Sequence, residues 1–202
     1  MTPGNYVPPV WRPSPSGGIV AVHEDARLSA QSACAPLLKD AVELMPIENE
    51  EVRSADDGLI WVYAPGICDL FHIGHVEFFR RARDLGDRVV AGIPSDENTA
   101  SYKPRPIMKL EERAAVVAAC RYVDRVIPDP PMVVDAAFLD SIGAAFACHG
   151  DDISEAERER VFPGLFATGR LKIVPYMRTV SSREIIERVA QRLREGTLRI
   201  RL

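Results

Sequence analysis

The chain has 202 residues, a formal net charge of −4 and 47% hydrophobic residues, which is enough to bury one sizeable core. This charge balance gives no overall basic field for nucleic acid or for an anionic membrane. No apolar run reaches the length of a membrane span, and the N-terminus lacks a basic region followed by an apolar segment. We therefore expect a cytoplasmic protein without a nucleic-acid or membrane partner.

The four cysteines are widely spaced, which favours reduced thiols over disulfides or a zinc site. They are Cys34, Cys68, Cys120 and Cys148.

Residues 1–57 read as an N-terminal extension. Five prolines within residues 1–24 predict an irregular path, because proline cannot donate a backbone hydrogen bond. A short helix beginning at Pro36 is compatible with the apolar residues that follow it. The polar stretch 48–58 reads as a linker, so we expect the main domain to occupy residues 58–202.

From Leu59 onward, strand-like and helix-like patterns alternate. Strands are predicted at 59–64, 88–93, 123–128, 144–148 and 171–176. Helices are predicted from about 76 to 85 and at 110–122, 134–142, 154–162 and 181–194, with a loop at 95–108. This alternation predicts an α/β fold: a Rossmann-like parallel five-stranded sheet with helices on both faces. Ligands of such sheets bind beyond the carboxyl ends of the strands.

Two histidines lie between the first strand and the first helix. Pro65 and Gly66 end the strand, and His72 and His75 fall in the turn before the helical apolar period. A helix N-terminus offers free N–H groups and a favourable dipole to a phosphate, and Gly74 permits close approach of the backbone. The alternative is that these are ordinary, partly buried histidines.

The sequence His72-Ile73-Gly74-His75, with Gly66 and Asp69 upstream, resembles the signature of the cytidylyltransferase family of HIGH-motif nucleotidyltransferases. Members of that family act on choline phosphate, ethanolamine phosphate and glycerol 3-phosphate. The resemblance continues, in family order, to about Arg192. Its further blocks are 86–93, 95–97, 103–108, 111–113, 121–124 and 149–152.

The resemblance implies catalytic roles for His72, His75 and Lys103, which would stabilise charge on the triphosphate and on the transition state. It implies nucleotide binding by a larger set: Gly66, Ile67, Asp69, Gly74, Arg113, Gly150, Asp152, Ser181 and Ser182. Each of four of these residues also has an alternative reading. Lys103 and Arg113 would then be solvated surface residues, Asp152 an acid in a surface loop, and Ser181 a simple helix N-cap.

The last family motif is altered here. Aligned on Ser181, its arginine falls on Tyr176 and its glycine on Thr179. Arg178 or Arg183 is a candidate substitute, and Arg105 is a further candidate for a phosphate contact.

The residues expected to bind the acceptor are Pro65, Lys103, Met132 and His149. The choline-phosphate branch of the family has an aspartate where this chain has Pro65 and a tryptophan where it has Met132. A quaternary ammonium prefers a carboxylate and an aromatic face. We therefore expect an acceptor with a neutral head, such as a polyol phosphate or a hydroxyalkyl phosphonate, with choline or ethanolamine phosphate as the alternative.

The expected reaction is in-line attack of the acceptor's phosphate or phosphonate oxygen on the α-phosphorus of CTP, with Mg²⁺ on the triphosphate as cofactor and no protein metal site. The resemblance also implies a homodimer, with the block at 121–124 near its contact. Two further alternatives stay open: an adenylyltransferase of the same superfamily, and a nucleotide-binding regulatory domain without turnover.

Overall fold

The computed structural model describes residues 10–13, 19–22, 58–177 and 179–198. The chain divides into two units, residues 1–43 and 44–202. In the first unit, β1 (Val10–Pro13) pairs antiparallel with β2 (Ile19–Val22). These two strands are regular structure within the extension expected to be partly irregular, and valine, tryptophan and isoleucine in them favour extended backbone. The expected helix after Pro36 and the 57/58 boundary lie outside the described residues.

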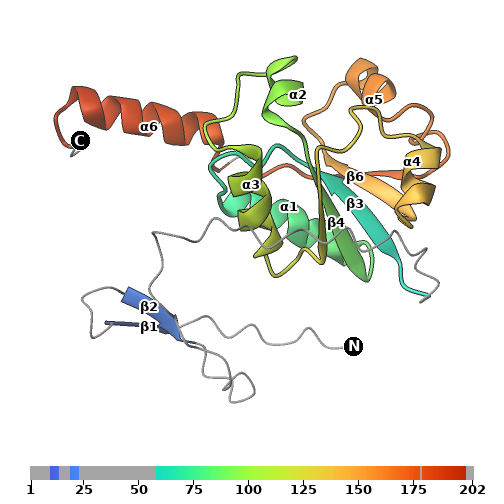
Figure 1. The fold of residues 1–202 in the computed structure, drawn as a ribbon, viewed down its shortest axis with the longest axis horizontal. Helices are drawn as coiled ribbons and strands as arrows, with labels where there is room; N and C mark the ends of the chain where they lie inside the picture. The colour runs from blue at the N-terminus through green and yellow to red at the C-terminus, as the bar shows by residue number, and fades with distance from the viewer. Residues whose placement is uncertain (1–9, 14–18, 23–57, 178, 199–202) are drawn as a thin grey trace. The chain divides into compact units, whose positions relative to one another are not determined.

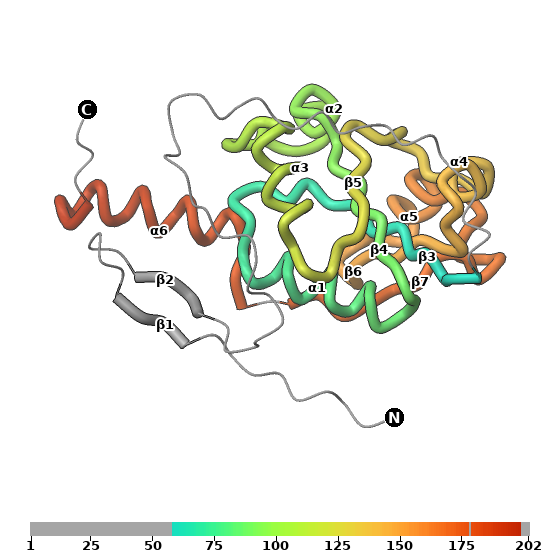
Figure 2. The backbone as a smooth tube through the Cα atoms, turned by 60° about the horizontal axis from the view of Figure 1, so that its bottom comes forward, coloured from blue at the N-terminus to red at the C-terminus, as the bar shows by residue number. Residues whose placement is uncertain are grey.

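The second unit is built on the predicted five-stranded parallel sheet (Figure 1). Its strands are β3 (Trp61–Pro65), β4 (Arg88–Ile93), β5 (Arg125–Pro128), β6 (Phe146–Gly150) and β7 (Leu171–Val174). Their spatial order is β5-β4-β3-β6-β7, so the chain reverses direction across the sheet between β3 and β6. Figure 2 labels the five strands along the backbone. The prediction of fold class is confirmed.

Helices cover both faces of this sheet. They are α1 (Ile73–Asp84), α2 (Asp96–Ala100), α3 (Leu110–Ala118), α4 (Ala136–Ser141), α5 (Glu155–Val161) and α6 (Ser182–Arg194). Residues of α1 and α3 pack with Val62 and Ala64 on one face, and residues of α4 pack with Tyr63 on the other. Side chains alternate across a strand, so β3 is buried on both sides.

Two local features differ from the sequence-based prediction. The segment 95–108 contains the helix α2, which Asp129 stabilises by accepting hydrogen bonds from Ser95 N (2.9 Å) and Asn98 Nδ2 (2.7 Å). The first helix begins at Ile73, so His72 is its N-cap and His75 lies in its first turn.

The thiols of Cys68, Cys120 and Cys148 are free and buried, as predicted, while Cys34 lies outside the described residues. No helix in the described ranges combines the length and apolar character needed to cross a bilayer.

The carboxyl ends of β3 and β4 meet closely at Gly92. A Cβ on Gly92 would lie 2.0 Å from the hydroxyl of Tyr63, and the Gly92 carbonyl accepts a hydrogen bond from Gly66 N at 2.9 Å. The Tyr63 ring is fully buried and packs edge-on against Phe138 at 5.3 Å, so it has little room to move.

We expect Gly92→Ala to lower the free energy of unfolding by about 1–3 kcal/mol, because the core is already filled. Chemical denaturation measures the loss. Tyr63→Phe removes the nearest clashing atom, so the double variant should lose less than the sum of the two single variants. A Gly92→Ala protein as stable as the parent would contradict this packing argument.

Candidate active site

The turn that joins β3 to α1 has an unusual backbone. Cys68 and Leu70 have φ angles of 57° and 48°, in the left-handed region that side chains other than glycine seldom adopt. Such strain persists only where surrounding structure holds it. Distant parts of the chain do so here: Arg113 and Ser182 bond to the backbone of the turn, and the loop at 107–108 bonds to the side chain of Asp69.

Arg113 is fully buried, so the alternative of a solvated surface arginine is wrong. Its guanidinium donates to the carbonyls of Ile67 (2.8 Å), Pro94 (2.8 Å) and Met108 (3.1 Å) and pairs with Asp96 at 2.6 Å. A buried charge is tolerated when it is paired and hydrogen-bonded in this way. Arg113 thus joins the turn after β3, the end of β4 and the start of α3. It does not line the cavity, described below, that holds most of the predicted site residues.

Asp69 connects the histidine turn to the lysine loop. Its two carboxylate oxygens accept hydrogen bonds from Ile107 N (3.0 Å) and Met108 N (2.9 Å). Its backbone carbonyl accepts one from Ser182 Oγ at 2.7 Å, which fixes the start of α6 against the same turn. Asp69 therefore positions the loop that carries Lys103.

The two histidines form a reciprocal cap at the start of α1. Gly74 N donates to His72 Nδ1, and His72 N donates to His75 Nδ1, both at 3.1 Å. The rings stack with centroids 3.8 Å apart. A Cβ on Gly74 would lie 2.9 Å from the His72 ring, so glycine makes room for the imidazole itself.

These hydrogen bonds determine the tautomer. A backbone N–H can only donate, so each Nδ1 must carry a lone pair, and the ring proton of the neutral imidazole sits on Nε2. Burial lowers the pKa of His75 to about 3, helped by the neighbouring His72 and opposed by Asp69. Burial likewise lowers the pKa of His72, against the charge of Glu184. Both rings are neutral Nε2–H donors at neutral pH.

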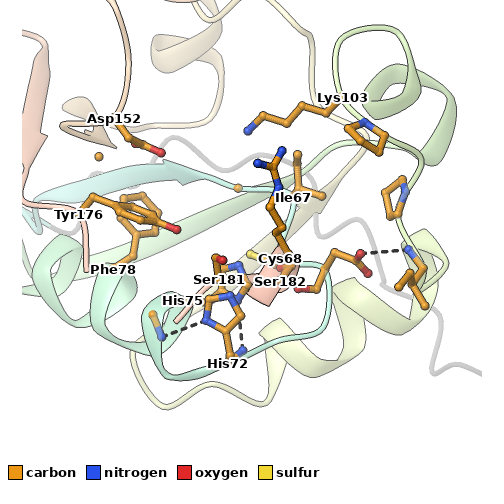
Figure 3. Close-up of a pocket in the computed structure, with 18 of the residues that line it drawn as sticks. Ile67, Cys68, His72, His75, Phe78, Lys103, Asp152, Tyr176, Ser181 and Ser182 are labelled. Carbon is orange, nitrogen blue, oxygen red and sulfur yellow. Dashed lines mark hydrogen bonds between the residues drawn. The ribbon is translucent and has the colours of Figure 1, made fainter. Parts of the chain in front are cut away.

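A cavity of about 600 Å³ lies beyond the carboxyl ends of β3 and β6, at the reversal of strand order. Figure 3 shows His72, His75 and the two serines at one side of it, with Lys103 reaching in from its loop. The cavity brings together most of the predicted site residues: Pro65, Gly66, Ile67, Asp69, His72, Gly74, His75, Lys103, Arg105, His149, Gly150, Asp152, Ser181 and Ser182.

A second cavity of about 230 Å³ adjoins the first and shares with it Pro65, Lys103, His149 and Asp152, among others. Met132 lines only this second cavity. The four residues expected to bind the acceptor therefore gather around one space.

The start of α6 is only partly described. Ser181 accepts from Glu184 N at 3.2 Å and is the N-cap of the helix. Arg183 lines the larger cavity, while Arg178 lies outside the described residues. Arg105 pairs with Glu97 at 3.3 Å in an exposed contact. The phosphate contacts of these arginines stay predictions.

Sequence reasoning assigned no ligand contact to several cavity residues. Phe78, Tyr176, Ile186 and Glu187 line the larger cavity, and Tyr102, Glu157 and Arg160 line the smaller one. Tyr176 already carried a signal, since it occupies the position of the family arginine. The residues of α5 carried none, because a short charged helix reads as a solvated face.

Within the described ranges, no group of three or more histidine, cysteine, aspartate or glutamate side chains could hold a metal ion. Both carboxylate oxygens of Asp69 are already bonded to backbone N–H groups.

The structure thus combines a parallel sheet with two neutral imidazole donors at a helix N-terminus, beside a tethered lysine loop, an arrangement that chemically suits a phosphate. Residues 63–188 match the family described as cytidylyltransferase-like, and the chain belongs to that family. The resemblance inferred from the histidine motif is confirmed.

Named relatives are similar over large parts of the chain. The ethanolamine-phosphate cytidylyltransferase of Dictyostelium discoideum is 37% identical over 64% of this chain and 36% of its own length. That of Arabidopsis thaliana is 31% identical over 82% of this chain and 40% of its own length. Human choline-phosphate cytidylyltransferase A is 30% identical over 89% of this chain and 53% of its own length. The chain thus spans about one third to one half of these relatives.

The His75 ring should stay neutral at pH values well below 7. In the unfolded chain a histidine titrates near 6.5. The folded state binds fewer protons than the unfolded state between that pH and about 3, so stability should fall as pH drops through this window. Imidazole nitrogen NMR of the folded protein should show the Nε2–H tautomer of His75 at pH 7 and unchanged at pH 5. A folded-state titration of His75 near pH 6.5 would contradict the cap geometry.

Asp69→Asn should loosen the lysine loop. An amide keeps one acceptor oxygen and turns an NH₂ toward a backbone N–H, so one of the two hydrogen bonds is lost. We expect a loss of about 1–3 kcal/mol in the free energy of unfolding and faster amide hydrogen exchange at Ile107 and Met108. Glu97→Gln, which removes only an exposed ion pair, is the matched control and should change stability by less than about 0.5 kcal/mol. Equal exchange in both variants would argue against the tether.

Proposed function

We propose that this protein transfers a cytidylyl group from CTP to the phosphate of phosphoethanolamine and releases pyrophosphate. The observation that carries the proposal is the pair of neutral imidazoles whose Nε2–H groups are available at the N-terminus of α1, in the cavity that Lys103 also enters. Family membership and the names of the relatives support the nucleotide and the acceptor.

In this reaction, an oxygen of the acceptor phosphate attacks the α-phosphorus in line. A new P–O bond forms, the bond to the bridging α,β-oxygen breaks, and pyrophosphate leaves with the electron pair. No nucleophile from the protein is required, so positioning and charge stabilisation supply the rate enhancement. His72 and His75 donate hydrogen bonds to phosphate oxygens, and Lys103 adds positive charge between the two cavities.

Mg²⁺ fits the site as an ion held by the triphosphate, since Mg²⁺ in such sites is often bound by substrate phosphates with one or two carboxylates. When bound, it would neutralise charge on the β- and γ-phosphates. Among the residues that line both cavities, Asp152 has the carboxylate that would bind this ion.

The choice of acceptor departs from the expectation drawn from Pro65 and Met132. The relatives named above act, by their names, on ethanolamine or choline phosphate, and nothing in the comparisons supports a polyol phosphate or a phosphonate. Asp152 and Glu157 line the second cavity, so their side chains offer it a counter-charge that Pro65 cannot.

Pyrophosphate release should require CTP, Mg²⁺ and phosphoethanolamine together, and ATP should not replace CTP. His72→Asn is the informative variant, because asparagine can cap α1 but lacks the Nε2–H donor. We expect turnover to fall about 10²–10³-fold while thermal unfolding changes little.

Asp135→Asn is the matched control. Asp135 caps α4 through Phe138 N at 2.8 Å and lines neither cavity, so turnover should be retained. Full activity of His72→Asn, or no transfer to phosphoethanolamine by the parent protein, would overturn the proposal.

A further inference from the structure

We infer that Glu157 of α5 is a specificity-determining residue that binds the ammonium group of the acceptor, in place of a carboxylate at position 65. The inference rests on the proposed function and deepens it. It concerns the end of the smaller cavity that faces away from the nucleotide.

The arrangement of the two cavities directs the acceptor. Lys103 and His149 line both, so a phosphate at their junction can reach the nucleotide in the larger cavity. The rest of the acceptor then extends into the smaller cavity. Its wall there is apolar where Met132 and Ile153 lie, and charged where α5 presents Glu157 and Arg160.

An ammonium group in this space needs a counter-charge and hydrogen-bond acceptors. Two carboxylates line the smaller cavity, those of Asp152 and Glu157. Asp152 lies at the junction, with Oδ1 4.0 Å from His149 Nδ1, where it faces the phosphate end of the acceptor. Glu157 lines only the smaller cavity, so it is the carboxylate placed for the opposite end.

The local structure holds Glu157 ready for this contact. Its Oε2 accepts from Ser154 N (3.2 Å) and Ser154 Oγ (2.7 Å), which fixes the side chain at the start of α5. The other oxygen, Oε1, has no hydrogen-bond partner in the part of the chain that the structure describes. These hydrogen bonds, with the positive charges of Arg160 and Lys103, lower the pKa of Glu157, so it is ionised at neutral pH.

The same wall favours a primary over a quaternary ammonium. A primary ammonium can donate a hydrogen bond to Oε1, whereas a trimethylated one depends on aromatic faces. Phe162 and Tyr63 are fully buried, which leaves Tyr102 as the exposed aromatic side chain in the wall of this cavity. Arg160 opposes both cations alike, so the difference comes from the hydrogen bond to Oε1, and we expect phosphoethanolamine to be used better than phosphocholine.

The test compares two acceptors that differ only at the head. Phosphoethanolamine carries an ammonium group, and 2-hydroxyethyl phosphate carries a hydroxyl group in its place. In Glu157→Gln, the ratio of kcat/KM for the first acceptor to that for the second should fall about tenfold, mainly through a higher KM for phosphoethanolamine. Glutamine keeps an acceptor oxygen for Ser154, so the helix cap survives. Arg160→Gln should move the ratio in the opposite direction.

Glu155→Gln is the matched control. Glu155 lies on the same helix with its side chain 91% exposed, pairs with Arg158 at 3.9 Å and lines neither cavity, so the ratio should not change. An unchanged ratio in Glu157→Gln, or a fall seen instead in Asp152→Asn, would overturn this inference while the parent still turns over phosphoethanolamine. A parent protein that does not use phosphoethanolamine overturns the proposed function and this inference with it.

Discussion

The buried guanidinium of Arg113 connects three loops that come together beneath the site. It donates to carbonyls that follow β3 and β4 and to one that precedes α3, and Asp96 balances its charge. Each bond fixes a backbone segment that no regular element holds. Since a charge without partners would be costly in the core, the loops can move away only together. This constraint keeps the strained turn and the lysine loop in register before any ligand binds.

In the proposed reaction, the histidines and the lysine would supply different kinds of stabilisation, because their surroundings differ. The backbone N–H groups of the α1 cap hold His72 and His75 as neutral donors, while Lys103 is exposed on its loop, where it could carry its charge to a phosphate. Neutral donors fixed by the fold lose little freedom when a ligand arrives, whereas an exposed lysine must be ordered by it. The tether from Asp69 to Ile107 and Met108 reduces that cost.

The sequence specified the sheet well because long apolar runs leave few alternatives. The strand 88–93 is observed where the pattern predicts it, and most cavity residues follow strands whose ends must converge. The helix α2 was not predictable in this way, because it is short and mostly polar, and its start is held by hydrogen bonds to Asp129, far along the chain. The buried position of Arg113 was not predictable for the same reason: a first turn reading Leu-Glu-Glu-Arg looks solvated, and two of its backbone partners lie 5 and 46 positions away.

The smaller cavity shows why specificity is harder to predict than fold. Two positions at which this chain departs from the family's pattern, 65 and 132, both line this cavity. These positions did not give the charge of the cavity, because α5 contributes Glu157 and Arg160 from a part of the sequence without a motif. A carboxylate is useful to a ligand wherever its oxygen lies within reach, whichever element carries it. Position 65 alone therefore does not decide whether the cavity can bind an ammonium, because the whole lining determines the charge that a ligand meets.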